Sequence, residues 1–151
     1  MRHKVWHLAL PVVLIIVSLP TGVALAGDCD GTPTDDSVTC SSDPLADTVV
    51  GLGLGNDTYT QDAGVTSDSV SGDGLEDGTE SVGNGGNDSI TINGTVLLCV
   101  DGDNVDGDGG NDTIIINGEV DCEVSGDYAT GNGGADKILS LIHISEPTRP
   151  Y

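Results

Sequence analysis

The feature that most limits how this chain can fold is a repeat of 24 residues. The segments GNGGNDSITING (83–94) and GDGGNDTIIING (107–118) are nearly identical, and GNGGADKI (131–138) begins another copy. A looser copy begins at 51–60, and the extra residues before the next copy fall mainly within 74–82. Repeats of this length are typical of stacked units that bury their apolar faces only against their neighbours.

Each unit continues with a short β-branched segment that predicts a β-strand. Ile90 and Ile92 are two positions apart and therefore share one face of the strand, as Ile114 and Ile116 do in the next unit. An Asn-Gly pair follows each segment and predicts that the chain turns there. The isoleucines of successive units are therefore expected to point into a common core.

A second apolar stretch, at 96–100 and again at 120–124, predicts a second strand in each unit. Apolar and acidic residues alternate in the later copy, so every other position is expected to face inward. The inward positions are Val96, Leu98, Val100, Val120, Cys122 and Val124. Gly-Asp turns are expected at 102–103 and 126–127, before a third, weaker segment.

Two all-β architectures are compatible with these signals. In the first, residues 51–138 form a repetitive β-solenoid with about 24 residues per coil and equivalent strands stacked in parallel. In the second, each Asn-Gly is the tight turn of an antiparallel hairpin. An isolated hairpin is barely stable, whereas a solenoid lets nearly identical strands pair with one another. The repeat therefore favours the β-solenoid.

The two ends of the chain differ in composition from the repeats. Residues 1–26 combine a basic start, an apolar run and the small-residue site Ala24-Leu25-Ala26, which predicts a secretory signal peptide. The apolar run is too short for a membrane span, and no later segment is apolar enough for one. We therefore expect the mature protein to be secreted, extracellular or held at the cell surface.

Residues 139–151 follow none of the repeat pattern. The segment LSLIHISEPTR (139–149) resembles the in-frame translation of a transposase-type sequencing adapter. We therefore treat 139–151 as a non-native tail, and expect the natural chain to continue past Ile138.

Four cysteines follow the export signal, so disulfides are expected. Cys29 and Cys40 are favoured as a pair that clamps an N-terminal capping segment, residues 27–50. A Cys99–Cys122 bridge is disfavoured, because Cys122 is expected to face inward and Cys99 outward in a continuous strand.

The charge of the chain excludes several classes of function. The chain has 25 Asp and Glu residues, and Lys137 is the only basic residue between 27 and 138, where histidine is absent. Nucleic acid binding requires cations that neutralise phosphates, so it is excluded. Serine–histidine or cysteine–histidine catalysis and histidine-ligated zinc are excluded as well, so no enzyme activity is expected in this segment. Carboxylate and amide oxygens are instead ligands that suit calcium.

The loops G-x-G-G-N-D-x-I, which occur at 83–90, 107–114 and, weakened, at 131–138, resemble the calcium-binding nonapeptide of RTX (hemolysin-type) proteins. GLGNDTY (53–59) is a partial match. The resemblance implies a β-roll in which Ca²⁺ binds between coils through loop carbonyls and the Asp, with Tyr59, Ile90, Ile114 and Ile138 pointing inward. It implies the ligands Asp57, Gly83, Gly85, Asn87, Asp88, Gly107, Gly109, Asn111, Asp112 and Asp136. The chain departs from the family because the motif recurs every 24 residues instead of in tandem.

Electrostatics leads to the same expectation without the family. Equivalent loops of a solenoid stack about 4.8 Å apart, which aligns Asp57, Asp88, Asp112 and Asp136 in one column. Neighbouring carboxylates at that spacing repel by about 3–4 kcal/mol at an effective dielectric constant near 20. A divalent cation between the coils turns this repulsion into attraction. Two metal-free alternatives remain: Asn and Asp can satisfy their own turns, and Asn56, Asn87 and Asn111 can form an amide ladder.

The sequence therefore predicts an exported calcium-binding β-repeat module with a structural, surface or adhesive role and an unidentified protein or glycan partner. The first alternative is a non-catalytic fragment of a larger carbohydrate-active β-helix enzyme. The second is a structural repeat that binds no metal.

Overall fold

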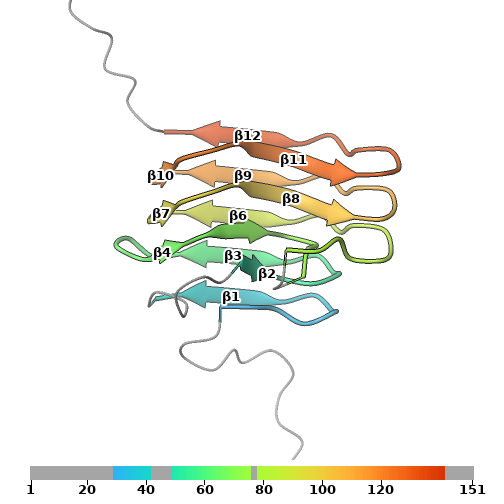
Figure 1. Ribbon diagram of the computed structural model, residues 1–151, viewed down its shortest axis with the longest axis horizontal. Helices are drawn as coiled ribbons and strands as arrows, with labels where there is room; N and C mark the ends of the chain where they lie inside the picture. Colours follow the sequence, from blue (N-terminus) through green and yellow to red (C-terminus); the bar gives the residue numbers. More distant parts are fainter. Residues whose placement is uncertain (1–28, 42–48, 76–77, 142–151) are drawn as a thin grey trace, which may run out of the picture.

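The computed structural model describes residues 29–41, 49–75 and 78–141. These residues form an all-β solenoid of about four turns, in which equivalent strands stack in parallel (Figure 1). Each complete coil contributes one strand to each of three sheets. The predicted signal peptide and the tail beyond Leu141 lie outside the described residues.

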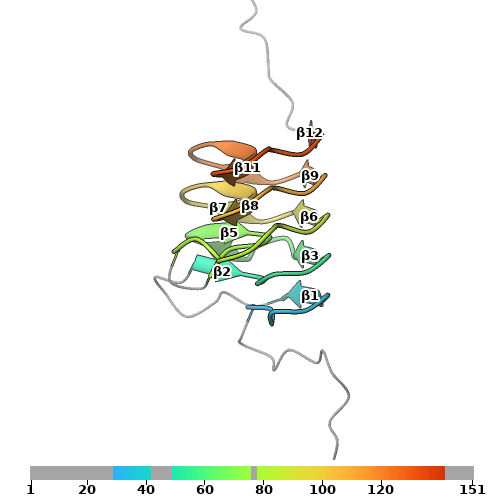
Figure 2. The ribbon, with the colours of Figure 1, turned by 90° about the vertical axis from the view of Figure 1, so that its right-hand side faces the viewer.

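The first sheet has five strands, in the order β1 (Ser37–Cys40), β3 (Thr58–Gln61), β6 (Ser89–Ile92), β9 (Thr113–Ile116) and β12 (Lys137–Ser140). The second sheet consists of β4 (Thr66–Ser67), β7 (Thr95–Val96) and β10 (Glu119–Val120). The third sheet consists of β2 (Val49–Gly51), β5 (Ser69–Ser71), β8 (Val100–Val105) and β11 (Val124–Ala129). In the view of Figure 2 the first sheet lies on one side of the stack and the third sheet on the other.

The register of the strands follows the repeat. Ile90 pairs with Ile114 and Val100 with Val124, and every pairing between named strands is parallel. The β-solenoid expected from the sequence is therefore confirmed, and the hairpin alternative is wrong. Asn93-Gly94 forms the corner between β6 and β7, which belong to different sheets, so the turn does not fold a strand back onto its predecessor.

The core is a set of stacked apolar columns along the solenoid axis. Tyr59, Ile90 and Ile114 occupy equivalent positions in β3, β6 and β9, and each is fully buried. Val70 and Val100 form a matching buried column from the third sheet. Because strand side chains alternate between faces, the neighbours of these residues in the first sheet point away from the core. Alternation therefore places the apolar residues of every coil in one continuous core.

The expectation of a single second strand at 96–100 is wrong. The chain leaves the second sheet after Val96 and enters the third at Val100, so a corner separates the two strands. The corner interrupts the alternation, and Leu98 and Cys122 are exposed instead of facing inward. The expected Gly-Asp turns are also wrong, because Gly102-Asp103 lies inside β8 and its counterpart lies inside β11.

The N-terminal segment forms part of the first coil. Cys29 and Cys40, the pair favoured from the sequence, are joined by a disulfide with a Cα–Cα distance of 5.3 Å. Between them, β1 pairs in parallel with β3 and forms the first strand of the first sheet. The segment expected to cap the solenoid therefore also supplies the first strand of its first sheet.

The second coil is longer than the others between β5 and β6, and residues 76 and 77 of this segment lie outside the described residues. Gly74 and Glu80 form an isolated antiparallel bridge in this segment, within the range expected from the sequence. At the other end of the solenoid, β12 continues the first sheet through Leu139 and Ser140, which pair with Ile115 and Ile116. These two residues of the expected tail thus have strand structure.

Candidate metal centre

The first Asp column consists of Asp57, Asp88, Asp112 and Asp136, each of which lies directly before or near the start of a strand of the first sheet. Each carboxylate is attached to the preceding coil through its Oδ1 atom. Asp88 Oδ1 accepts a hydrogen bond from the backbone N–H of Asp57 at 2.8 Å, and Asp112 Oδ1 accepts one from Asp88 N–H at 2.8 Å. Asp136 Oδ1 accepts the equivalent bond from Asp112 N–H at 3.0 Å. The column is therefore fixed by the stacking of the coils.

A second Asp column, which consists of Asp73, Asp103 and Asp127, runs beside the first at the level of the third sheet. These carboxylates are held by the glycine-rich loop of the following coil. Asp127 Oδ2 accepts a hydrogen bond from Gly134 N–H at 2.6 Å, and Asp103 Oδ2 accepts the equivalent bond from Gly110 N–H. In both cases the donor is the last glycine of the G-x-G-G motif.

The two columns meet in three groups of three carboxylates, each with oxygen atoms within 4.8 Å of one another. The groups are Asp57/Asp73/Asp88, Asp88/Asp103/Asp112 and Asp112/Asp127/Asp136. Asp88 belongs to the first two groups and Asp112 to the last two, so the three groups form a continuous line along the solenoid. Carboxylate oxygens that converge from three positions are a donor set compatible with a metal ion.

The central group contains unpartnered buried oxygens. Asp88, Asp103 and Asp112 expose at most 2% of their surface, yet Asp88 Oδ2, Asp103 Oδ1 and Asp112 Oδ2 have no hydrogen-bond partner. Buried polar atoms in proteins are almost always satisfied, so three such oxygens in one place are compatible with a bound cation.

Glycine backbone forms the walls around these oxygens. A methyl group at Gly102 would overlap Asp112 Oδ2 and the carbonyl oxygen of Gly126, and one at Gly72 would overlap Asp88 Oδ2. Only glycine leaves room there for the carboxylate of the next coil. The same close approach brings main-chain carbonyl oxygens next to the carboxylates, which adds to the oxygen ligands at hand.

Burial changes the ionisation of the columns. Desolvation raises the pKa of Asp88 to about 8 and that of Asp57 and Asp112 to about 7, although the backbone N–H bonds oppose this shift. Neighbouring carboxylates raise these pKa values further. The pKa of Asp103 is also raised, by burial first and then by the adjacent Asp73 carboxyl. Lys137 is the only cationic side chain in the described part of the chain, and it is exposed. Ionised carboxylates in this line therefore have no neutralising partner among the described side chains.

The loop residues predicted as ligands fall into two sets. Gly85 and Gly109 border the second Asp column, because a methyl group at Gly85 would overlap the Asp103 carboxylate and one at Gly109 would overlap that of Asp127. Gly107, by contrast, packs on the carbonyl oxygen of Gly83, so this pair serves the contact between loops.

Asn87 and Asn111 lie outside the carboxylate groups. Asn111 Nδ2 donates to Asn87 Oδ1 at 2.9 Å, and Asn87 Nδ2 donates to Asn56 Oδ1 at 3.0 Å, on the exposed side of the loops. The amide ladder considered from the sequence is therefore present, and it exists beside the Asp columns instead of replacing them.

The second Asp column is not predicted from the sequence. Its signal is the Gly-Asp pair that recurs at 72–73, 102–103 and 126–127, and the sequence predicts turns at the last two of these positions. Nor is the start of the first coil predicted, where Asp35-Asp36 occupies the place of Asn56-Asp57. Asn56 N–H donates to Asp35 Oδ1 at 2.9 Å, and Asp36 N–H donates to Asp57 Oδ1 at 2.6 Å.

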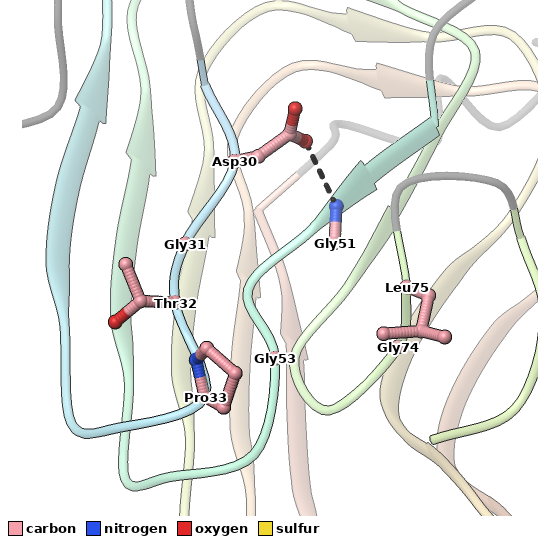
Figure 3. Close-up of a pocket in the computed structure, with 8 residues that line it drawn as sticks. All are labelled: Asp30, Gly31, Thr32, Pro33, Gly51, Gly53, Gly74 and Leu75. Carbon is pink, nitrogen blue, oxygen red and sulfur yellow. Dashed lines mark hydrogen bonds between the residues drawn. The ribbon is translucent and has the colours of Figure 1, made fainter.

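A separate pocket of about 260 Å³ lies near the N-terminal end of the solenoid (Figure 3). Its lining includes Thr32, Pro33 and Leu75 and four glycines. Asp30 is its only charged side chain, and Asp30 Oδ1 accepts a hydrogen bond from Gly51 N–H at 3.2 Å. The pocket thus lacks the converging polar groups that the Asp columns provide.

Comparison with known protein families, with curated proteins and with solved structures finds no match to this chain. No helix in the described residues is long and apolar enough to cross a membrane.

Proposed function

We propose that this protein is an exported structural module that binds Ca²⁺ between its coils, and that the bound ions complete the stability of the solenoid. The observation that carries the proposal is the set of three buried, unpartnered carboxylate oxygens on Asp88, Asp103 and Asp112. Isolated buried carboxylates cost several kcal/mol unless they are paired or neutralised. A divalent cation in the central group would offset most of this negative charge.

The donor chemistry favours calcium over other divalent ions. Ca²⁺ takes six to eight oxygen ligands at about 2.3–2.6 Å in flexible geometry, which suits a mixture of carboxylates and main-chain carbonyls. Mg²⁺ demands a near-ideal octahedron and retains water, and zinc and copper bind more readily to imidazole or thiolate. The three Asp groups consist of oxygen donors alone. The RTX-like loops of the sequence support the same ion.

Neighbouring carboxylate groups share residues. Since Asp88 and Asp112 each belong to two groups, each of them would help to hold the ions of two neighbouring groups. Calcium is scarce inside cells and abundant outside. A protein that carries the expected signal peptide would therefore reach its stable state after export, where it would act as a surface or adhesive element.

The test is a comparison of thermal melting and far-ultraviolet circular dichroism of the full chain in calcium, in magnesium and in EDTA. We expect calcium to raise the melting temperature and to preserve the β signal at concentrations where magnesium does neither. At a calcium concentration 100 times the dissociation constant, each site adds about 2.7 kcal/mol. Identical melting in calcium and EDTA would refute the proposal.

A matched pair of variants separates specific binding from general charge screening. The variant Asp88→Asn/Asp112→Asn keeps the side-chain oxygens that accept the bonds from Asp57 and Asp88 but removes two charges from the central group. The control Asp108→Asn removes a charge from an exposed position of the loops, where Asp108 N–H donates to Asn84 Oδ1 and Asn132 N–H donates to Asp108 Oδ1. Calcium should stabilise the control as it stabilises the parent and should have little effect on the double variant.

The second candidate function is a structural repeat that needs no metal, and the amide ladder of Asn56, Asn87 and Asn111 favours it. In this case protons neutralise the Asp columns at the raised pKa values given above. Such a protein would melt at the same temperature in EDTA and calcium at neutral pH, so the same experiment decides between the two candidates.

A further inference from the structure

Cys99 and Cys122 lie at the corner between the second and third sheets in two successive coils. Their Sγ atoms are 2.8 Å apart. A thiol is a weak hydrogen-bond donor, and non-bonded sulfur atoms rarely approach so closely. A disulfide requires an S–S distance of about 2.0 Å, so bond formation needs a movement of less than about 1 Å.

The backbone holds the corner in a fixed position on both sides. Asp121 N–H donates to the Val96 carbonyl at 3.0 Å, and Val100 N–H donates to the Glu123 carbonyl at 3.0 Å. The carbonyl of Cys99 also accepts from Val70 N–H at 3.1 Å, which ties it to the second coil. The sulfur atoms are therefore brought together by the stacking of the coils and not by a mobile loop.

The break in strand alternation makes the contact possible. In one continuous strand, Cys99 and Cys122 would face opposite sides, because they occupy positions that differ by one residue. The corner removes this constraint. Cys122 is exposed and Cys99 is partly exposed, so a solution oxidant can reach the pair.

We propose that Cys99 and Cys122 form a disulfide that covalently joins the third and fourth coils. The oxidant is a disulfide of the low-molecular-weight or protein class, as found in extracellular compartments. The exposed Cys122 thiolate attacks one sulfur of this disulfide, forms a mixed disulfide and releases one thiolate. The Cys99 thiolate then attacks Cys122 Sγ, forms the Cys99–Cys122 bond and expels the second thiolate. The two cysteines are oxidised, the oxidant is reduced to two thiols, and the two cysteine protons end on those thiols.

This bond would join the same two coils that supply the central carboxylate group. The third coil supplies Asp88 and Asp103, and the fourth coil supplies Asp112. The cross-link therefore joins the two coils whose carboxylates repel each other in the central group. It maintains their stacking whether or not a cation is bound, and its formation does not depend on the proposed calcium binding.

The test is peptide mapping of the full chain after equilibration with reduced and oxidised glutathione, in EDTA and in calcium. Free thiols are alkylated, and the digest is analysed by mass spectrometry without reduction. We expect a cross-linked peptide that contains Cys99 and Cys122 and has lost two hydrogens. Alkylation of both residues in a sample whose Cys29–Cys40 bond is intact would overturn the proposal, as would pairing of either residue with another cysteine.

A second measurement connects the bond to the coils. In the variant Cys29→Ser/Cys40→Ser, a reductant should lower the melting temperature, because Cys99–Cys122 is then the only disulfide left to reduce. In a variant with all four cysteines changed to serine, the same reductant should have no effect. A melting temperature of the first variant that does not respond to the reductant would contradict a stabilising cross-link. Because both variants are measured in EDTA, this result is independent of the calcium experiment.

Discussion

Asp112 Oδ1 accepts a hydrogen bond from the backbone N–H of Asp88 at 2.8 Å, one coil earlier, while Asp112 Oδ2 is buried without a partner. The bond holds the carboxylate in place, so the side chain cannot turn toward solvent to relieve its repulsion with Asp88 and Asp103. The Asp112 side chain therefore both joins two coils and repels the neighbouring carboxylates. When the Asp column is ionised and no cation is bound, this repulsion weakens the contact between the coils.

This relationship predicts that Asp112→Asn stabilises the metal-free protein. The amide keeps an oxygen for the bond from Asp88 N–H and removes one negative charge. The repulsion between neighbouring carboxylates is about 3–4 kcal/mol at an effective dielectric constant near 20, which is an upper limit, so the gain in EDTA near pH 8 should be about 1–3 kcal/mol. Urea denaturation measures it. The exposed control Asp108→Asn should change the stability by less than about 0.5 kcal/mol.

The raised pKa values predict how the stability of the metal-free protein depends on pH. Folding raises the pKa of Asp57 and Asp112 to about 7 and of Asp88 to about 8, from an ordinary value of 3.8. Between the ordinary pKa of 3.8 and the raised values of about 7 to 8, the folded state binds more protons than the unfolded state. The free energy of unfolding therefore falls as pH rises through this range. The urea midpoint in EDTA should therefore be higher near pH 5 than near pH 9.

Calcium should reverse this dependence, because the ion binds the deprotonated carboxylates. The stabilisation by calcium should grow as pH rises through the same window. If the midpoint in EDTA instead increased steadily from about pH 5 to pH 9, the columns would not be the groups that control the stability.

Some parts of this structure are predictable from the sequence and others are not, for physical reasons. The 24-residue period predicted the parallel stacking, because the identity of Ile90 and Ile114 at equivalent positions is visible without coordinates. The corner at 97–99 was missed, since a short break between two apolar strands has the same pattern as a continuous one. The first Asp column was predicted from one recurring motif.

The second Asp column was missed for a different reason. Asp103 and Asp127 lie inside six-residue strands and next to glycines, and the Gly-Asp pair is more often found in turns. The three-carboxylate groups arise only when the end of one coil meets the start of the next. This contact joins residues such as Asp103 and Asp112 from different parts of the repeat, and no local pattern contains it.

The glycine-rich loop predicts that Gly110→Ala interrupts the solenoid. A methyl group at Gly110 would overlap the carbonyl oxygen of Gly86 in the preceding coil, and backbone atoms cannot move aside as a side chain can. The substitution would also displace the N–H that binds Asp103. We expect a loss of more than about 3 kcal/mol, or a failure to fold, measured by urea denaturation in calcium. The exposed control Asp121→Ala should lie within about 0.5 kcal/mol of the parent.

The core column predicts a stabilising substitution at Tyr59. This side chain is fully buried at the position that Ile90 occupies in the next coil, and its hydroxyl group has no hydrogen-bond partner. Burial accordingly raises the pKa of Tyr59 above its ordinary value. An unsatisfied buried hydroxyl costs about 1–3 kcal/mol, so Tyr59→Phe, which retains the ring and removes the oxygen, should increase the free energy of unfolding by about 1 kcal/mol or more. The control Tyr128→Phe, at a side chain that is 66% exposed, should have no measurable effect in the same urea titration. A loss of stability in Tyr59→Phe would show that the hydroxyl has a partner in solution, such as a bound water, and that the core column at this level is not dry.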